Sequence, residues 1–216
     1  MSTFDTPAGD VSVKFDGPAS APAWLVLAHG AGADMSHPFM ETVAADLGAR
    51  GIRVCRFNFV YMEMGRKAPD RQPVLEQTYL SVVRRVREES GRARLFAGGK
   101  SMGGRIASHV SALGEPLDGL VFLGYPLHPP GRPERIRDAH LPDVTAPMLF
   151  VEGTRDPFCP LETLDTVLER LDTPTEVAVI EDGDHSFKVP KSSGRTSKEA
   201  LTEVVEVVAG WIATRL

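Results

Sequence analysis

The chain has 216 residues and a mass of 23.4 kDa, which is enough for one domain with a substantial buried core. Its composition, 42% hydrophobic and 25% charged, is typical of a globular chain and excludes a disordered one. The net charge of −5 argues against a protein that binds nucleic acid by neutralising phosphates.

Cysteine content and the N-terminal segment bear on where the protein works. Cys55 and Cys159 are too few for a disulfide framework or a Cys-rich zinc site, and we expect Cys55 to be buried and Cys159 more exposed. The N-terminus lacks the basic and apolar regions of a signal peptide. The apolar run 23–28 is far shorter than the roughly 20 residues that a membrane span needs. We therefore predict a cytoplasmic protein with no membrane span.

Short apolar runs alternate with longer amphipathic stretches along the chain. The predicted buried strands are 24–28, 52–57, 95–97, 120–123, 148–151 and 177–180. The predicted helices between or after them are 39–47, 75–86, 106–113, 161–171 and 201–212. Residues 11–15 alternate weakly and are predicted to form an antiparallel edge strand. This order predicts one α/β domain over residues 1–216, with a mostly parallel sheet of six or seven strands and helices on both faces.

The loop after the first run, His29-Gly-Ala-Gly-Ala-Asp-Met35, is rich in glycine and lies where a parallel sheet places its chemistry. Such a loop can turn a backbone N–H toward a reacting carbonyl oxygen. We predict Ala31 as one oxyanion donor, and we expect His29 to brace the loop rather than to transfer protons.

The third run leads directly into Gly99-Lys100-Ser101-Met102-Gly103, a G-x-S-x-G pattern between a strand and a helix. Glycines on both sides of the serine allow a sharp turn that lifts its hydroxyl clear of the chain. Ser101 is therefore the predicted nucleophile, and the N–H of Met102 is the second predicted oxyanion donor. A phosphate-binding loop is a poor alternative, because Arg94 stands where that motif needs glycine.

An acid and a histidine follow the fifth and sixth runs. Asp156 and His185 complete the chain order Ser…Asp…His, in which histidine takes the serine proton and the acid orients the imidazole. Of the six histidines, only His185 follows the last strand. Asp182 and Asp184 are the alternatives for the acid, but they lie very close to His185 in the same loop.

These residues together resemble the α/β-hydrolase superfamily. The stretches 29–40 and 56–59 are similar to a narrower branch of small hydrolases, which includes testis-expressed proteins and a chromatin-complex subunit and is loosely akin to the dienelactone hydrolases. The resemblance covers roughly residues 22–213. It implies the α/β-hydrolase fold and serine-hydrolase chemistry. Dienelactone hydrolases use a cysteine nucleophile, whereas this chain has Ser101, so their substrate does not carry over.

The segment 125–146 is too short and too rich in proline for a helical cap domain, so we predict none. The segment 60–73 could cover part of the site. Such an open site suits short or surface-presented acyl groups. The predicted pocket walls are Tyr61, Tyr125, Leu127, Phe158 and Phe187.

The sequence thus predicts a serine hydrolase that cleaves a small carboxylic ester or thioester through an acyl-enzyme. We expect no metal, no cofactor and no nucleic-acid partner, and the oligomeric state stays open. The alternative is a non-catalytic scaffold that uses this fold to bind protein, which the resemblance to a chromatin-complex subunit suggests.

Overall fold

All eight strands of the computed structural model, which describes residues 2–216, join in one sheet with the order β1-β2-β4-β3-β5-β6-β7-β8. The strands are β1 (Ser2–Phe4), β2 (Val11–Asp16), β3 (Ala23–Ala28), β4 (Ile52–Phe57), β5 (Arg94–Lys100), β6 (Gly119–Leu123), β7 (Met148–Gly153) and β8 (Thr175–Ile180). β1 and β2 pair antiparallel, as do β2 and β4, and all other neighbours pair parallel.

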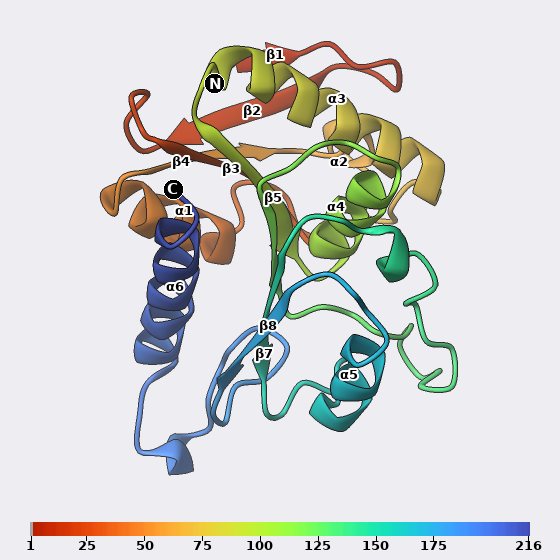
Figure 1. The fold of residues 1–216 in the computed structure, drawn as a ribbon, viewed down its shortest axis with the longest axis vertical. Coiled ribbons are helices and arrows are strands. Elements are labelled where there is room, and N and C mark those ends of the chain that lie inside the picture. The colour runs from red at the N-terminus through yellow and green to blue at the C-terminus, as the bar shows by residue number, and fades with distance from the viewer. Residues whose placement is uncertain (1) are drawn as a thin grey trace.

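Helices cover both faces of this sheet (Figure 1). The helices are α1 (Pro38–Ala49), α2 (Val60–Glu63), α3 (Gln72–Ser90), α4 (Met102–Ala112), α5 (Leu161–Leu168) and α6 (Ser197–Ala213), with short 3-10 turns at Leu141–Asp143 and Lys191–Ser193. α1 and α6 pack together on one face, and α3 and α4 pack on the other. None of the helices in residues 2–216 has both the length and the apolar character needed to cross a bilayer.

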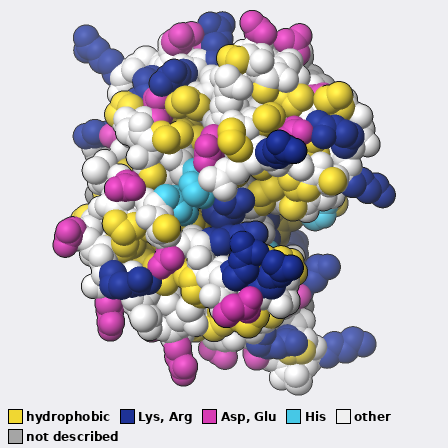
Figure 2. All heavy atoms as spheres, turned by 90° about the vertical axis from the view of Figure 1, so that its right-hand side faces the viewer, with side chains coloured by type: hydrophobic (Ala, Val, Ile, Leu, Met, Phe, Trp, Pro, Cys, Tyr) yellow, Lys and Arg dark blue, Asp and Glu magenta, His cyan; other side chains and the backbone are white. Residues whose placement is uncertain are grey.

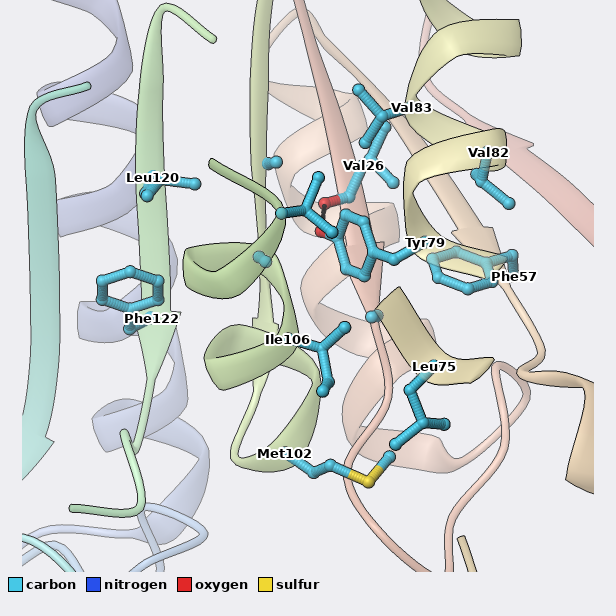
Figure 3. Packing of buried hydrophobic residues seen from close by; sticks show 14 of the residues in the cluster. Val26, Phe57, Leu75, Tyr79, Val82, Val83, Met102, Ile106, Leu120 and Phe122 are labelled. Atoms are coloured by element: carbon cyan, nitrogen blue, oxygen red, sulfur yellow. Dashed lines mark hydrogen bonds between the residues drawn. The ribbon is translucent and has the colours of Figure 1, made fainter. Parts of the chain in front are cut away.

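Each face of the sheet has its own apolar core. One cluster lies between the sheet and α3 and α4, and the other lies between the sheet and α1 and α6. Figure 3 shows part of the first cluster, in which Tyr79 of α3 points between the strands. Its hydroxyl is 2.9 Å from the carbonyl oxygen of Val26 and 2.7 Å from that of Gly98, which ties α3 to β3 and β5. The buried hydroxyl is thus fully bonded.

The predicted architecture is confirmed, and three details differ. The sheet has eight strands rather than six or seven, because the three-residue β1 adds to β2. The predicted edge strand around residues 11–15 is antiparallel but lies inside the sheet, between β1 and β4. The helix predicted over 161–171 ends at Leu168. No cap domain interrupts the chain: residues 125–146 contain only the 3-10 turn at Leu141–Asp143.

Candidate active site

Ser101 stands alone between β5 and α4, in the strained backbone of a sharp turn. Its φ of 51° lies in the left-handed region, which residues other than glycine seldom adopt. A Cβ atom at Gly99 or at Gly103 would lie 2.4 Å from the carbonyl oxygen of Ala28. Only glycine fits at these two positions, so the motif brings β3, β5 and α4 into close backbone contact around the serine.

A continuous chain of hydrogen-bonded side chains runs from this serine. The Nε2 atom of His185 lies 2.9 Å from Ser101 Oγ, and its Nδ1 atom lies 2.6 Å from Asp156 Oδ2. The second carboxylate oxygen of Asp156 accepts a 2.8 Å hydrogen bond from the N–H of Phe158. The Asp156 side chain is fully buried, whereas the His185 side chain is 21% exposed. An imidazole held in this way can accept the serine proton.

The glycine-rich loop after β3 lies directly beside the serine. A Cβ atom at Gly30 would be 3.6 Å from Ser101 Cβ, and Ala31 lines the space in front of the hydroxyl. His29 is fully buried beneath the loop; its Nδ1 lies 2.8 Å from Gly30 O, and its Nε2 accepts from Phe59 N–H. Burial lowers the pKa of His29, which keeps the ring neutral, as a bracing role requires.

Two cavities meet at Ser101 and Ala31. The smaller one, of about 440 Å³, is bounded by α3, α4 and the loop after β6, and Met102 lies in its wall. The larger one, of about 860 Å³, is bounded by α1, α6 and the loop after β8, and His185 lies in its wall. The serine hydroxyl therefore lies between two separate cavities, each of which could hold one part of a substrate.

Of the five residues predicted as pocket walls, two line a cavity. Phe158 lines the smaller cavity and Phe187 the larger one. Tyr61, Tyr125 and Leu127 are fully buried in the core and line neither cavity, so the prediction is corrected for these three. Their positions next to strand ends and loops do not reveal that the side chains turn inward.

A buried polar cluster lies behind Ser101 and Asp156. Lys100 is 9% exposed, and its Nζ has no hydrogen-bond partner in residues 2–216. Burial lowers the pKa of Lys100 to about 8, against the attraction of Asp156, Glu152 and Asp184. Burial also raises the pKa of Glu152 well above its ordinary value; one of its oxygens accepts from Tyr125 N–H at 2.6 Å.

The two cysteines are both free thiols in the interior. Cys55 is 1% exposed, as predicted. Cys159 is also 1% exposed, so the prediction that it is more accessible is wrong. It follows the Asp156 turn immediately, but its side chain turns into the core with Tyr125 and Leu127.

The pocket prediction missed two arginines. Arg105 and Arg137 both line the smaller cavity beside Ser101. Arg105 lies one helical turn after Ser101, and its backbone N–H donates to Ser101 O at 3.1 Å. This spacing of four residues could have indicated that the Arg105 side chain lies beside the serine. Arg137 lies in the proline-rich loop after β6, where no sequence pattern indicates the direction of a side chain.

Comparison with known proteins gives a consistent result. The model of a family described as "Alpha/beta hydrolase domain" matches residues 21–213. An alpha-beta serine hydrolase homologue from Coxiella burnetii is similar in fold, with a TM-score of 0.77 and 21% identity over 96% of this chain and 94% of the other.

Two further solved structures are similar to the same extent. One is a serine hydrolase without a lid from Xanthomonas campestris, with a TM-score of 0.76 and 23% identity over 97% of this chain and 93% of the other. The second is a dienelactone hydrolase from Anabaena variabilis, with a TM-score of 0.77 and 20% identity over 99% and 95% of the two chains. At these identities the likeness concerns the fold.

Proposed function

Because the chain belongs to the alpha/beta hydrolase family, we propose that it is a serine hydrolase that cleaves a carboxylic ester or thioester through an acyl-enzyme. The observation that carries this proposal is the hydrogen-bonded chain from Ser101 through His185 to Asp156, with the serine at the junction of two cavities. This geometry supports the proposal, because acyl transfer needs a nucleophile within reach of a base and a base oriented by an acid.

In the first half-reaction, Ser101 Oγ attacks the carbonyl carbon while its proton passes to His185 Nε2. The carbonyl oxygen takes up the electron pair and is stabilised by the N–H groups of Met102 and Ala31. Met102 is the first residue of α4, so its N–H has no partner within the helix. When the intermediate collapses, the bond to the leaving group breaks, and His185 donates its proton to the departing oxygen or sulfur.

In the second half-reaction, water replaces the leaving group. His185 accepts a proton from water as the water oxygen bonds to the acyl carbon. The bond between that carbon and Ser101 Oγ then breaks, and the serine recovers its proton from His185. The products are a carboxylic acid and an alcohol or thiol. Asp156 stays ionised throughout and stabilises the imidazolium.

The decisive experiment is labelling with a fluorophosphonate probe, followed by peptide mass spectrometry to locate the adduct. We expect one adduct, on Ser101, and its loss in Ser101→Ala and His185→Ala. Ser186→Ala is a matched control, because this exposed serine lines the larger cavity but lies outside the hydrogen-bonded chain. An unlabelled but folded wild-type protein would refute the hydrolase proposal and favour the protein-binding scaffold.

A further inference from the structure

The smaller cavity is lined by two arginines that lack an ion-pair partner in the described part of the chain. Arg105 and Arg137 both line it, and in residues 2–216 neither forms an ion pair with a carboxylate. Arg105 donates to Gln72 Oε1 at 3.2 Å and lies 3.2 Å from His109 Nε2, while its Nε has no partner. The guanidinium of Arg137 makes no hydrogen bond to another described residue, so most of its donors are free.

Acids around the cavity are already engaged elsewhere. Asp70 lines the cavity; its Oδ1 pairs with Arg66 at 2.6 Å, and its buried Oδ2 has no hydrogen-bond partner in residues 2–216. Asp138, next to Arg137, pairs with Arg170 at 2.5 Å. Glu76 on α3 attracts Arg105 without forming an ion pair with it, and it accepts a hydrogen bond from Gln72 Nε2 at 2.7 Å. In residues 2–216 neither cavity arginine thus has a carboxylate in direct contact.

The two guanidinium groups also repel each other. Both are half-buried, and burial lowers the pKa of Arg137, with a further lowering from the charge of Arg105. An arginine does not lose its proton at neutral pH, so both side chains stay charged. A bound anion would relieve the repulsion, because one carboxylate can accept from both side chains.

Neutral polar groups complete this corner of the molecule. His109 and His140 stack with ring centres 3.5 Å apart, and burial lowers their pKa values to about 3 and about 4. They line a further hollow of about 260 Å³ together with Arg105 and Arg137. Figure 2 shows histidine and Lys or Arg side chains gathered in a hollow on the face where α3, α4 and the loop after β6 lie. Among residues 2–216, no acid lines the hollow of about 260 Å³, and its two charged groups are the arginines.

The two cavities can be assigned to the two halves of the substrate. His185 must reach the leaving group to protonate it, and His185 lines the larger cavity. Ser101 lines both cavities, so the two halves of the substrate can lie on opposite sides of it. On this argument from His185, the leaving group is assigned to the larger cavity and the acyl chain to the smaller cavity with the arginines.

We propose that Arg105 and Arg137 bind a carboxylate at the far end of the acyl group, so that the preferred substrates are monoesters or monothioesters of dicarboxylic acids. This inference rests on the hydrolase function proposed above. It makes the two arginines determinants of specificity rather than catalytic residues, because they contact the substrate away from the reacting carbon.

The test compares matched esters. The 4-nitrophenyl monoesters of glutaric, adipic and pimelic acid are assayed against neutral analogues whose terminal carboxylate is a primary amide. Ser101→Ala supplies the spontaneous rate. We expect wild-type kcat/KM to be at least about tenfold higher for the acid of the best-fitting length, the gain of about one charge-assisted hydrogen bond.

Arg137→Gln is the central variant, because it removes no hydrogen bond of the folded chain. It should erase the preference for the acid, mainly through KM, because kcat/KM for the acid falls by more than kcat/KM for the amide analogue. Arg92→Gln is the matched control: it removes one positive charge at an exposed site before β5, at the opposite end of that strand from Ser101. It should preserve the preference.

Two results would overturn the inference separately from the hydrolase function. If all esters are cleaved by a route that needs Ser101, but acid and amide react equally or Arg137→Gln keeps the preference, the carboxylate site is wrong and the hydrolase stands. If no ester is cleaved, calorimetry with adipate decides: binding that is lost in Arg137→Gln supports the site, and no binding refutes it.

Discussion

The carboxylate of Asp156 uses its two oxygens for two different neighbours. One oxygen accepts from the N–H of Phe158 and the other faces His185 Nδ1. The hydrogen bond from the Phe158 N–H fixes the plane of the Asp156 carboxylate, and the carboxylate in turn fixes the orientation of the His185 ring. The competing acids are engaged differently: Asp184 Oδ1 accepts from the N–H groups of Ser186 and Lys188 within its own loop.

We therefore expect Asp156→Asn to lower kcat by about 10⁴-fold, the loss seen for this change in the template triad, because an amide favours the wrong tautomer of the imidazole. Asp182→Asn is the control, since the Asp182 carboxylate contacts no group of the triad, and it should leave kcat unchanged. Steady-state kinetics on one activated ester measures both. A loss at Asp182 with none at Asp156 would mean that the acid is misassigned.

Lys100, directly before Ser101, gives a prediction about stability. Its pKa is lowered to about 8 in the folded chain, from an ordinary value of 10.5. Between these values the unfolded chain holds more protons, so the free energy of unfolding rises with pH from about 8 to about 10.5. Below pH 8 the buried charge costs stability.

Replacing this lysine should expose that cost. Lys100→Met should be more stable than wild type at pH 7, by roughly 3 kcal/mol at 1.36 kcal/mol per pKa unit, and the difference should vanish toward pH 10.5. Urea unfolding at several pH values measures it. Lys67→Met, at an exposed site, is the control and should show no such trend. A difference that stays constant with pH would contradict the assignment of the effect to Lys100 ionisation.

At the scale of elements, the turn between β5 and α4 tolerates no side chain at its flanking glycines. A Cβ at Gly99 would collide with the backbone of Ala28 at 2.4 Å. Gly99→Ala should destabilise the fold by several kcal/mol and abolish probe labelling, because β3 and α4 must both move away from β5. Thermal unfolding and labelling report both effects.

Gly210→Ala provides the matched control within a helix. Gly210 lies near the end of α6, and a Cβ there would meet no atom within 4 Å. The same substitution should therefore stabilise the protein by up to about 1 kcal/mol, because alanine favours the helix. Equal effects of the two substitutions would contradict a local steric requirement at Gly99.

Elements that repeat an apolar pattern could be predicted from the sequence, and those without one could not. The buried strands and the helices carrying Leu75, Ile106 and Val204 followed from their spacing. The three residues of β1 offer no pattern, so the eighth strand was missed. The G-x-S-x-G motif located Ser101, because the spacing of its glycines in the sequence indicates a sharp turn of the backbone.

Pocket walls depend on side-chain direction, which the sequence does not encode. Tyr125 follows the end of β6, where a pocket residue is expected, yet its hydroxyl turns inward to within 3.2 Å of Ser108 Oγ. Arg137 appears in the sequence as one more solvated charge in a proline-rich loop. Its direction depends on how that loop folds back, with the N–H of Arg137 donating to Leu127 O at 2.7 Å.

At the scale of the whole molecule, no cap domain stands over the two cavities, and the loop from Tyr125 to Ala146 folds against α4 through its 3-10 turn. A hydrolase without a mobile cap needs no opening movement when it meets a lipid surface. The rate of hydrolysis of a short-chain ester, plotted against ester concentration, should therefore follow a single hyperbola, with no jump where the ester exceeds its solubility. A lipase with a known lid is the reference in the same assay, and a jump at the limit would indicate a closing segment.

The three side chains of the proposed mechanism follow β5, β7 and β8 in chain order. Ser101 and His185 are 84 residues apart, and β8 is the last strand, with β7 as its one neighbour in the sheet. During synthesis Ser101 therefore leaves the ribosome long before His185. If His185 activates the serine as proposed, reactivity at Ser101 begins only when the final strand docks, and a serine-directed probe then labels fully folded molecules rather than partly folded ones.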